Sequence, residues 1–188
     1  MNDMRTVFFV GKPGCGKGTQ AELLSKTTGW PAIIGGDQFR AIAAEDTLVG
    51  RKVKEEYDAG RLQPQWLAEY LFLKSLFSLP GDTTAIFDGF SRRKPEAEMI
   101  LNVLTWLGRQ TVVIYVKVSD DSARKRIAIR KEIAGRADDS VVDERLKEFY
   151  ANTEPAIELF RKAGVLIEVD GEPAPETIAE NIRTALKI

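Results

Sequence analysis

The stretch VFFVGKPGCGKGTQAELLSK, residues 7–26, decides the fold. It begins with an apolar run typical of a buried strand, continues through glycines and a lysine, and ends in a helical pattern. Gly11, Gly16 and Lys17 lie in the register of G-x-x-x-x-G-K-[ST], a loop whose backbone N–H groups surround a phosphate. Gly18 stands where the magnesium-binding hydroxyl is expected, and threonine comes one place later. We therefore predict a nucleotide-binding loop with a shifted hydroxyl, rather than a glycine turn with a solvated lysine.

The composition narrows the possible chemistry and partners. The chain has 188 residues, with 27 Lys and Arg against 28 Asp and Glu, one cysteine and no histidine. This balance excludes a global basic field for nucleic acid or anionic lipid, and the missing histidine excludes Cys/His zinc sites and histidine triads. Residues 1–5 do not resemble a signal peptide, and no apolar stretch is long enough for a membrane span. We expect a cytoplasmic monomer that binds neither nucleic acid nor membranes.

Apolar runs bounded by turn residues alternate with longer helical patterns along the chain. We predict strands at 6–10, 84–87, 111–118 and 165–169, and helices at 17–28, 65–79 and 95–107. Runs rich in Val, Ile and Phe are typical of parallel strands that are buried on both faces. The pattern therefore predicts an α/β fold, a three-layer P-loop NTPase fold with a central parallel sheet, whose ligands lie at the carboxyl ends of the strands.

Two polar segments interrupt this alternation. Residues 36–62 form a helix-rich excursion with scattered apolar positions, and residues 131–139, KEIAGRADD, form a short charged link. Both are expected to be flaps over the site. Without repeats or a long linker, we interpret 1–188 as a single domain with flaps at about 35–64 and about 131–139.

The loop sequence GKPGCGKGTQ, residues 11–20, resembles that of the adenylate kinase group of nucleoside monophosphate kinases, which carries Gly-Thr after the lysine. The resemblance runs from Thr6 to the C-terminus, and it is most specific in this loop. It implies reversible transfer of the ATP γ-phosphate to AMP or another nucleoside monophosphate, which gives two diphosphates. Mg²⁺ would accompany ATP and be held mainly by phosphates and water, so the displaced hydroxyl becomes a family feature, with Thr19 contacting phosphate oxygens.

The resemblance also implies a set of residues for ATP. In the loop these are Gly14, Cys15, Gly16, Lys17, Gly18 and Thr19. Lys17 would bridge the terminal phosphates, whereas Cys15 would be a small filler in a cradle that needs only backbone. Arg126 and Arg130 lie four residues apart on one helix face. One alternative is that both belong to a solvated, charged helix without a role in binding. By the resemblance, Arg126 would stack on the donor adenine and Arg130 would contact the phosphates.

Further arginines are implied for the transferred phosphoryl group. The expected catalytic residues are Lys17, Arg92, Arg130, Arg136 and Arg145. By the resemblance to the family's lid segment, Arg136 and Arg145 would close over the transferred group. Arg92 would contact the acceptor phosphate and the moving phosphoryl group, while Asp88 would orient water bound to magnesium.

Three segments resemble the acceptor site of the family: GGDQFR at 35–40, AGRLQPQ at 59–65 and IFDGFSRRKPEAE at 86–98. The implied acceptor-binding residues are Gly35, Arg40, Gln63, Gly89, Arg92 and Glu96. Arg40 would grip the acceptor phosphate, because a planar guanidinium matches phosphate better than an ammonium does.

Four positions of this acceptor site depart from the family pattern: Gly35, Gln63, Ser91 and Glu96 replace threonine, valine, proline and glutamine. A non-proline residue favours a trans peptide bond, so we expect Phe90–Ser91 to be trans. Glutamine can donate to adenine N1 and accept from its N6 amino group, whereas the Glu96 carboxylate only accepts, which suits guanine or uracil better. Alternatively, Glu96 follows Pro95 as an ordinary acidic residue in the first turn of a helix.

Two other functions stay open on the sequence alone. The chain could be a phosphate-loop kinase of another small metabolite, although the pair GDQFR and DGFSR argues against this. It could also be a nucleotide-dependent binding or assembly factor that kept the fold and lost efficient turnover, since its acceptor pocket is altered. Turnover with different nucleoside monophosphates separates the three functions.

Overall fold

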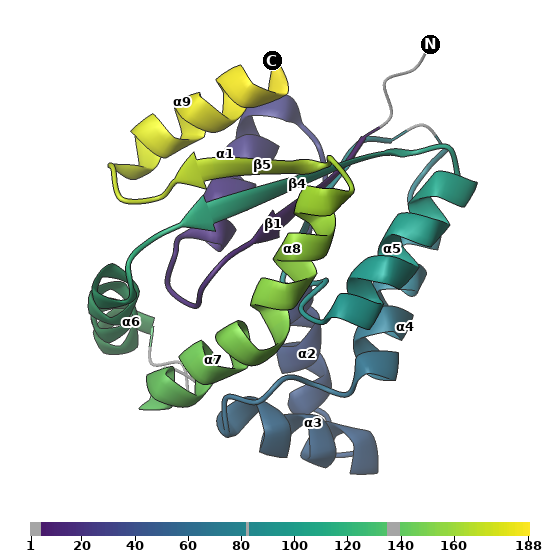
Figure 1. Cartoon of the computed structure of the whole chain (residues 1–188). Helices are drawn as coiled ribbons and strands as arrows, with labels where there is room; N and C mark the ends of the chain where they lie inside the picture. The colour runs from purple at the N-terminus through teal and green to yellow at the C-terminus, as the bar shows by residue number, and fades with distance from the viewer. Residues whose placement is uncertain (1–4, 82, 135–139) are drawn as a thin grey trace.

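The computed structural model describes residues 5–81, 83–134 and 140–188 (Figure 1). In chain order its elements are β1 Arg5–Val10, α1 Lys17–Thr28, β2 Ala32–Ile34, α2 Gly35–Ala43, α3 Leu48–Asp58, α4 Gln65–Phe77, β3 Ala85–Asp88, α5 Lys94–Trp106, β4 Gln110–Lys117, α6 Asp120–Ala134, α7 Val142–Glu148, η2 Phe149–Thr153, α8 Glu154–Lys162, β5 Leu166–Asp170 and α9 Pro175–Leu186. The element η2 is a π-helical turn between α7 and α8.

The described strands form one parallel sheet in the order β2-β3-β1-β4-β5. Helices α1 and α9 cover one face of the sheet, and α4, α5 and α8 cover the other (Figure 1). This confirms the predicted three-layer α/β fold with a central parallel sheet. The predicted strands and helices are found within one or two residues of their expected ends, but β2, α8 and α9 were not predicted.

The strand β1 lies at the centre of the sheet and divides its side chains between two apolar layers. Phe8 and Val10 point to the layer under α4, α5 and α8, whereas Val7 and Phe9 point to the layer under α1 and α9. All of these side chains are buried, as expected for a parallel strand covered on both faces. Burial on both sides fixes the end of β1, and therefore the start of the phosphate loop, residues 11–16.

Four phenylalanines join the sheet to the loop that follows β3. The ring centroids of Phe8, Phe72, Phe87 and Phe90 lie between 5.2 and 6.0 Å apart in five neighbouring pairs. Tilted and edge-to-face pairs of this kind add to the stabilisation from burial alone. Gly35 packs against the Phe90 ring, so this cluster also supports the start of the acceptor flap, residues 35–64.

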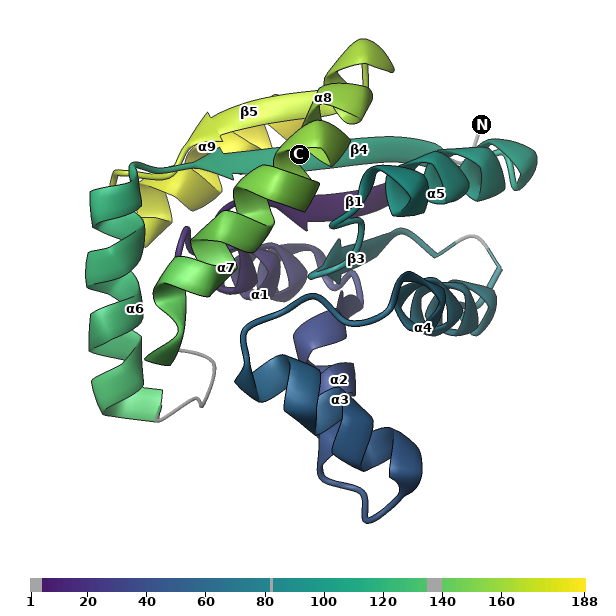
Figure 2. The same cartoon turned by 60° about the horizontal axis from the view of Figure 1, so that its bottom comes forward.

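The flap and α6 stand on opposite sides of the carboxyl ends of the strands (Figure 2). Helices α2 and α3 pack against each other on one side, and α6 packs against α7 on the other. The predicted lid at 131–139 is only partly described. Residues 131–134 belong to α6 rather than to a separate link, and residues 135–139, which include Arg136, lie outside the described residues.

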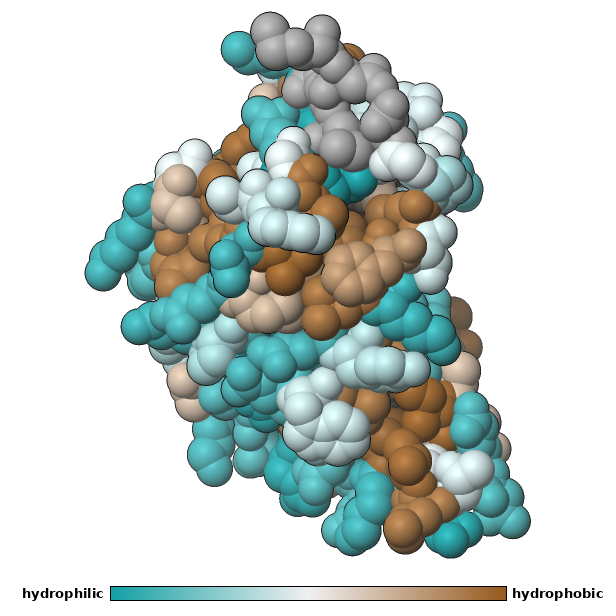
Figure 3. Space-filling view, turned by 90° about the vertical axis from the view of Figure 1, so that its right-hand side faces the viewer, coloured by the Kyte–Doolittle hydropathy of each residue, from teal (hydrophilic) through white to brown (hydrophobic). Residues whose placement is uncertain are grey.

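The outer face of α4 and α5 carries apolar and aromatic side chains amid hydrophilic ones (Figure 3). Phe77 and Trp106, at the C-terminal ends of these helices, are 64% and 82% exposed. Each helix therefore buries only the side that meets the sheet. Within the described ranges, every helix is too short or too polar to cross a bilayer.

The flap itself depends on a close backbone contact at Gly50 in the first turn of α3. The Thr47 side chain accepts a hydrogen bond from Gly50 N at 2.9 Å, which caps this helix. A Cβ atom at Gly50 would lie 2.2 Å from Glu45 O and 2.7 Å from Ile42 O. Only glycine fits here without a shift of the backbone that connects α2 to α3.

We expect Gly50→Ala to lower the free energy of unfolding by about 1–3 kcal/mol, because the added methyl group overpacks the turn. Helix propensity alone predicts the opposite sign, a gain of roughly 0.5–1 kcal/mol. Urea denaturation measures the change. Gly81→Ala is the matched control, since a Cβ atom there meets no atom within 4 Å and should change stability by less than about 0.5 kcal/mol. Stabilisation by Gly50→Ala would contradict the contact.

Candidate active site

The phosphate loop passes between β1 and α1 with its backbone pressed against α6. Gly14 has a φ of 78°, and a Cβ atom there would lie 2.6 Å from Ala123 O. A side chain at this position is therefore excluded by both conformation and space. Gly16 is the N-cap of α1 and provides no side-chain cap, so the first N–H groups of α1 and the positive end of its dipole remain available to an anion.

The space beside Gly18 accounts for the shifted hydroxyl. A Cβ atom at Gly18 would lie 3.4 Å from Asp88 Oδ2, at the carboxyl end of β3. A serine or threonine at this position would add a hydroxyl next to that carboxylate. With glycine, the first turn of α1 lies close to Asp88, while the exposed Thr19 carries its hydroxyl at the cavity wall.

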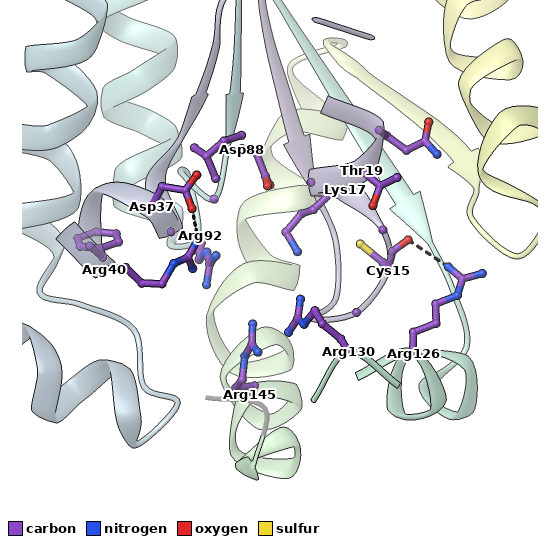
Figure 4. Close-up of a pocket in the computed structure, with 18 of the residues that line it drawn as sticks. Cys15, Lys17, Thr19, Asp37, Arg40, Asp88, Arg92, Arg126, Arg130 and Arg145 are labelled. Atoms are coloured by element: carbon purple, nitrogen blue, oxygen red, sulfur yellow. Dashed lines mark hydrogen bonds and ion pairs between the residues drawn. The ribbon is translucent and has the colours of Figure 1, made fainter. Parts of the chain in front are cut away.

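Cationic side chains from different elements converge in front of the loop (Figure 4). Lys17 from α1, Arg92 from the loop after β3, Arg130 from α6 and Arg145 from α7 all line one cavity of about 650 Å³. Lys17 Nζ also donates to Lys12 O at 3.2 Å. Positive charges gathered in one cavity repel each other and favour a polyanionic ligand. The cavity is therefore suited to a chain of phosphates.

Arg126 has a different place from the converging cations. Its guanidinium donates to Cys15 O at 3.2 Å, to Gly171 O at 2.8 Å and to Glu172 O at 3.3 Å. It therefore ties the phosphate loop to the turn between β5 and α9. Because these bonds engage the N–H edge of the guanidinium, its flat face remains for stacking. The Cys15 side chain is fully buried beneath the loop, as a small filler would be.

Arg40 lies on α2 at the acceptor side of the cavity. Its guanidinium forms an ion pair with Asp37, and Nη1 donates to the Tyr57 hydroxyl at 2.7 Å. These two partners hold the guanidinium at the cavity wall, next to Arg92 in the close-up (Figure 4). A phosphate at this place would exchange the bond to Asp37 for a bond to its own oxygens.

Glu96 lies in the first turn of α5, and only 3% of it is exposed. Its Oε2 accepts a hydrogen bond from Arg92 N at 2.8 Å, so the carboxylate does serve the helix N-terminus, as one of the two sequence interpretations proposed. Burial raises the pKa of Glu96, while the bond from Arg92 and the charge of Arg93 act in the opposite direction. Glu96 also lines the cavity, so the capping role leaves a second role possible.

Ser91 takes a left-handed conformation, with a φ of 61°. No cis peptide bond occurs among the described residues, so the Phe90–Ser91 bond is trans, as expected. The next residue, Arg92, is held through its backbone on both sides, because Arg92 O accepts from Thr153 Oγ1 at 3.1 Å and Arg92 N donates to Glu96. Arg92 is therefore positioned by η2 and α5 together.

Most predicted site residues meet at this cavity. Its wall includes Gly14, Cys15, Gly16, Lys17, Gly18, Thr19, Arg40, Gln63, Asp88, Gly89, Arg92, Glu96, Arg126, Arg130 and Arg145. Gly35 does not line it but lies directly behind Gly36, buried against Phe90. Arg136 lies outside the described residues.

Sequence reasoning missed two residues near the site. Arg93 lines the cavity and contacts Glu96, although nothing distinguishes it in the sequence from neighbouring basic residues. Lys12, in the phosphate loop, donates to Asp120 Oδ1 at 2.5 Å, and the Tyr150 hydroxyl donates to the same oxygen at 2.6 Å. Lys12 thus connects the loop to α6 and η2, a contact that only the fold reveals.

Comparisons with known proteins agree with this geometry. A family model described as adenylate kinase matches residues 9–165. The chain belongs to the adenylate kinase family. The adenylate kinases of Maricaulis maris and Thermus thermophilus are 36% and 35% identical to it over 187 residues, which cover 98% of this chain and 99% and 98% of those proteins. The adenylate kinase of Thermobifida fusca is 32% identical over 184 residues, covering 96% of this chain and 97% of that protein.

Membership in the adenylate kinase family makes the chain an ATP-binding phosphotransferase, a nucleoside monophosphate kinase. Among the described residues no group of three or more Cys, Asp or Glu side chains could hold a metal by itself. Asp88, beside the loop, offers one carboxylate, which fits Mg²⁺ that keeps phosphate and water ligands.

We expect Lys17→Met to reduce phosphoryl transfer by at least about a hundredfold, because its charge stabilises developing negative charge and its side chain is not part of the core. The melting temperature should stay close to that of the wild type. A coupled assay of ADP formation measures the loss. Lys26→Met, an exposed change in the last turn of the same helix, is the control. Near-normal turnover of Lys17→Met would contradict the assignment of the loop.

Proposed function

We propose that this nucleoside monophosphate kinase uses AMP as its acceptor and transfers the γ-phosphoryl group of Mg–ATP to it reversibly, giving two ADP. The observation that carries the proposal is the convergence of Lys17, Arg92, Arg130 and Arg145 between the phosphate loop and the acceptor flap. The names of the relatives support AMP, since each of those cited is an adenylate kinase.

The proposed mechanism needs no nucleophile from the protein. An oxygen of the acceptor phosphate attacks the γ-phosphorus directly, and the bond between this phosphorus and the β,γ-bridging oxygen breaks. Catalysis then comes from positioning and from cationic groups around the equatorial oxygens. Lys17 contacts the β- and γ-phosphates, while Arg92 stays in contact with the phosphoryl group as it moves towards the acceptor. Arg136 is proposed to join this group by resemblance to the family.

The two nucleotides are bound on opposite sides of the transferred phosphoryl group. We assign the ATP phosphates to the loop from Gly14 to Thr19 and the donor base to the flat face of Arg126. Arg40 holds the acceptor phosphate. Asp88 would hold Mg²⁺ through water, and the ion would neutralise phosphate charge. Closure of the flap and of the segment after α6 would exclude water, which otherwise could accept the phosphoryl group.

Other parts of the proposal rest on the sequence and the family. We propose that the chain is a single domain with two flaps, that it is located in the cytoplasm and that it is a monomer. A kinase of another small metabolite and an assembly factor without turnover are not favoured, because the chain belongs to the adenylate kinase family.

The acceptor is tested by measuring kcat/KM with ATP and each of AMP, GMP, UMP, CMP and dTMP. We expect AMP to give the highest value. A higher value with another monophosphate would overturn AMP as the acceptor, and absence of turnover with all five would overturn the kinase activity of this chain.

The two acceptor-side arginines should differ in their kinetic effects. We expect Arg92→Ala to lower kcat by at least about a hundredfold, because this side chain follows the moving phosphoryl group. We expect Arg40→Ala mainly to raise KM for AMP, since it binds the phosphate in the ground state and the transition state alike. Steady-state kinetics with varied AMP and ATP separate the two.

Arg161→Ala is the control, because its exposed guanidinium pairs with Glu158 and Glu168 and does not line the cavity. If Arg92→Ala and Arg40→Ala changed only KM for ATP, the assignment of the donor and acceptor sites would be wrong and would have to be reversed.

A further inference from the structure

An ion pair between the partly buried Arg93 and the buried Glu96 forms part of the acceptor wall of the cavity. Arg93 Nη1 donates to Glu96 Oε1 at 3.3 Å and to Gln63 O at 2.6 Å, and Nη2 donates to Leu62 O at 3.3 Å. The Arg93 side chain is 25% exposed and that of Glu96 only 3%. Arg93 is therefore not a solvated surface cation. It lies between α5 and the end of the acceptor flap, and all three of Arg93, Glu96 and Gln63 line the cavity.

The hydrogen-bonding capacity of Arg93 is not used up by these partners. A guanidinium carries five N–H groups, and those on Nη1 are both engaged. One N–H of Nη2 and the N–H of Nε have no partner among the described residues. The same wall therefore offers N–H donors beside a carboxylate, and not acceptors alone.

Acceptors on this wall are also available. Each oxygen of the Glu96 carboxylate accepts one hydrogen bond in the described structure and can accept another. Gln63 is 6% exposed, and its Nε2 donates to Val53 O at 2.9 Å. Its Oε1 is buried without a hydrogen-bond partner among the described residues, so a ligand N–H would satisfy an acceptor that is otherwise costly to bury.

Adenine matches this mixture of groups. Its N6 amino group carries two N–H donors, which can serve Glu96 and Gln63, and its neighbouring N1 needs a donor. A carboxylate cannot supply that donor, whereas Arg93 can.

We propose that Arg93 is a specificity-determining residue, which donates a hydrogen bond to N1 of the acceptor adenine while Glu96 accepts from the N6 amino group. The pair Arg93–Glu96 then supplies the donor and the acceptor that a single glutamine amide would supply. This inference rests on the proposed function, because it concerns the base of AMP. It also removes the conflict between a carboxylate at position 96 and an adenine acceptor.

The charge of Arg93 has a second effect on the same subsite. Burial favours the protonated form of Glu96, and the positive charge of Arg93 opposes this. Arg93 therefore helps to keep the carboxylate an acceptor at neutral pH. A protonated Glu96 would itself carry an O–H donor beside its carbonyl acceptor, so the assignment of Arg93 as the donor to N1 requires Glu96 to be ionised.

Base analogues test the assigned hydrogen bonds atom by atom. The substrates are AMP, 1-deaza-AMP, in which N1 is replaced by C–H, and purine riboside 5′-monophosphate, which lacks the amino group. We expect the wild type to lose roughly ten- to a hundredfold in kcat/KM with 1-deaza-AMP. In Arg93→Met this loss should shrink to less than about threefold, since the donor to N1 is already missing.

Arg51→Met is the matched control, because Arg51 pairs with Asp46 on the flap and does not line the cavity. It should keep the wild-type loss with 1-deaza-AMP. Each comparison is a ratio of two substrates on one preparation, so a fraction of unfolded enzyme cancels. If Arg93→Met kept the full wild-type loss, Arg93 would only hold the flap and the proposal would be overturned.

Rescue gives a second, independent readout. Glu96→Gln added to Arg93→Met removes the unpaired buried carboxylate and provides an amide that can donate to N1 and accept from N6. We expect the double variant to regain both turnover with AMP and the loss with 1-deaza-AMP. A merely structural Arg93, needed for its bonds to Leu62 O and Gln63 O, predicts no rescue.

Failure of the proposed function gives a different result from failure of this inference. If the wild type preferred another nucleoside monophosphate, AMP as the acceptor would be wrong, and the inference would fall with it. If AMP were preferred but the analogue ratios of Arg93→Met and the wild type were equal, only the role of Arg93 would be wrong. Loss of sensitivity to the amino group in Arg93→Met, with sensitivity to N1 kept, would likewise contradict the assignment.

Discussion

The contact between the backbone of the phosphate loop and α6 is the constraint on which the site depends. At Gly14 the loop lies so close to Ala123 O that a side chain is excluded, and Arg126 of the same helix donates to Cys15 O. Lys12 adds an ion pair to Asp120 at the start of α6. The helix that carries Arg130 is thus docked on the phosphate loop, so a cation on α6 and the loop residues line the same cavity.

The acceptor side is positioned by side chains and not by a single loop. Phe90 packs in the aromatic cluster and supports Gly35, which sets the start of the flap. The end of the flap is tied to α5 by Arg93, and η2 holds the Arg92 carbonyl through Thr153. A π-helical turn at this place is consistent with its frequent occurrence near functional sites. The flap therefore has two anchors, which meet at the loop after β3.

Most of the fold could be predicted from the sequence because its decisive patterns are local. Four strands could be predicted from apolar runs and the loop from its glycines, whereas β2 has only three half-buried residues and no period to detect. The residues expected at the site followed from motifs shared with a family, and most of them line one cavity. Arg93 could not be predicted, since its role comes from carbonyls about 30 residues away, at Leu62 and Gln63. The two interpretations of Glu96 could be weighed only with Arg92 N and Arg93 in place.

The donor side is built mainly from backbone and the acceptor side from side chains, so amino-acid substitutions should affect the two sides differently. In the proposed function the donor phosphates would face backbone N–H groups, which only a substitution to proline removes, so the transfer chemistry would depend mainly on keeping the loop and its cations. By the same proposal the acceptor base would face side chains, and four positions of the implied acceptor site differ from the family pattern that this chain resembles. An exchange of an amide for an arginine and carboxylate pair alters how a base is read without touching Lys17 or Arg92. Base recognition in this fold can therefore vary while the phosphoryl-transfer groups stay the same.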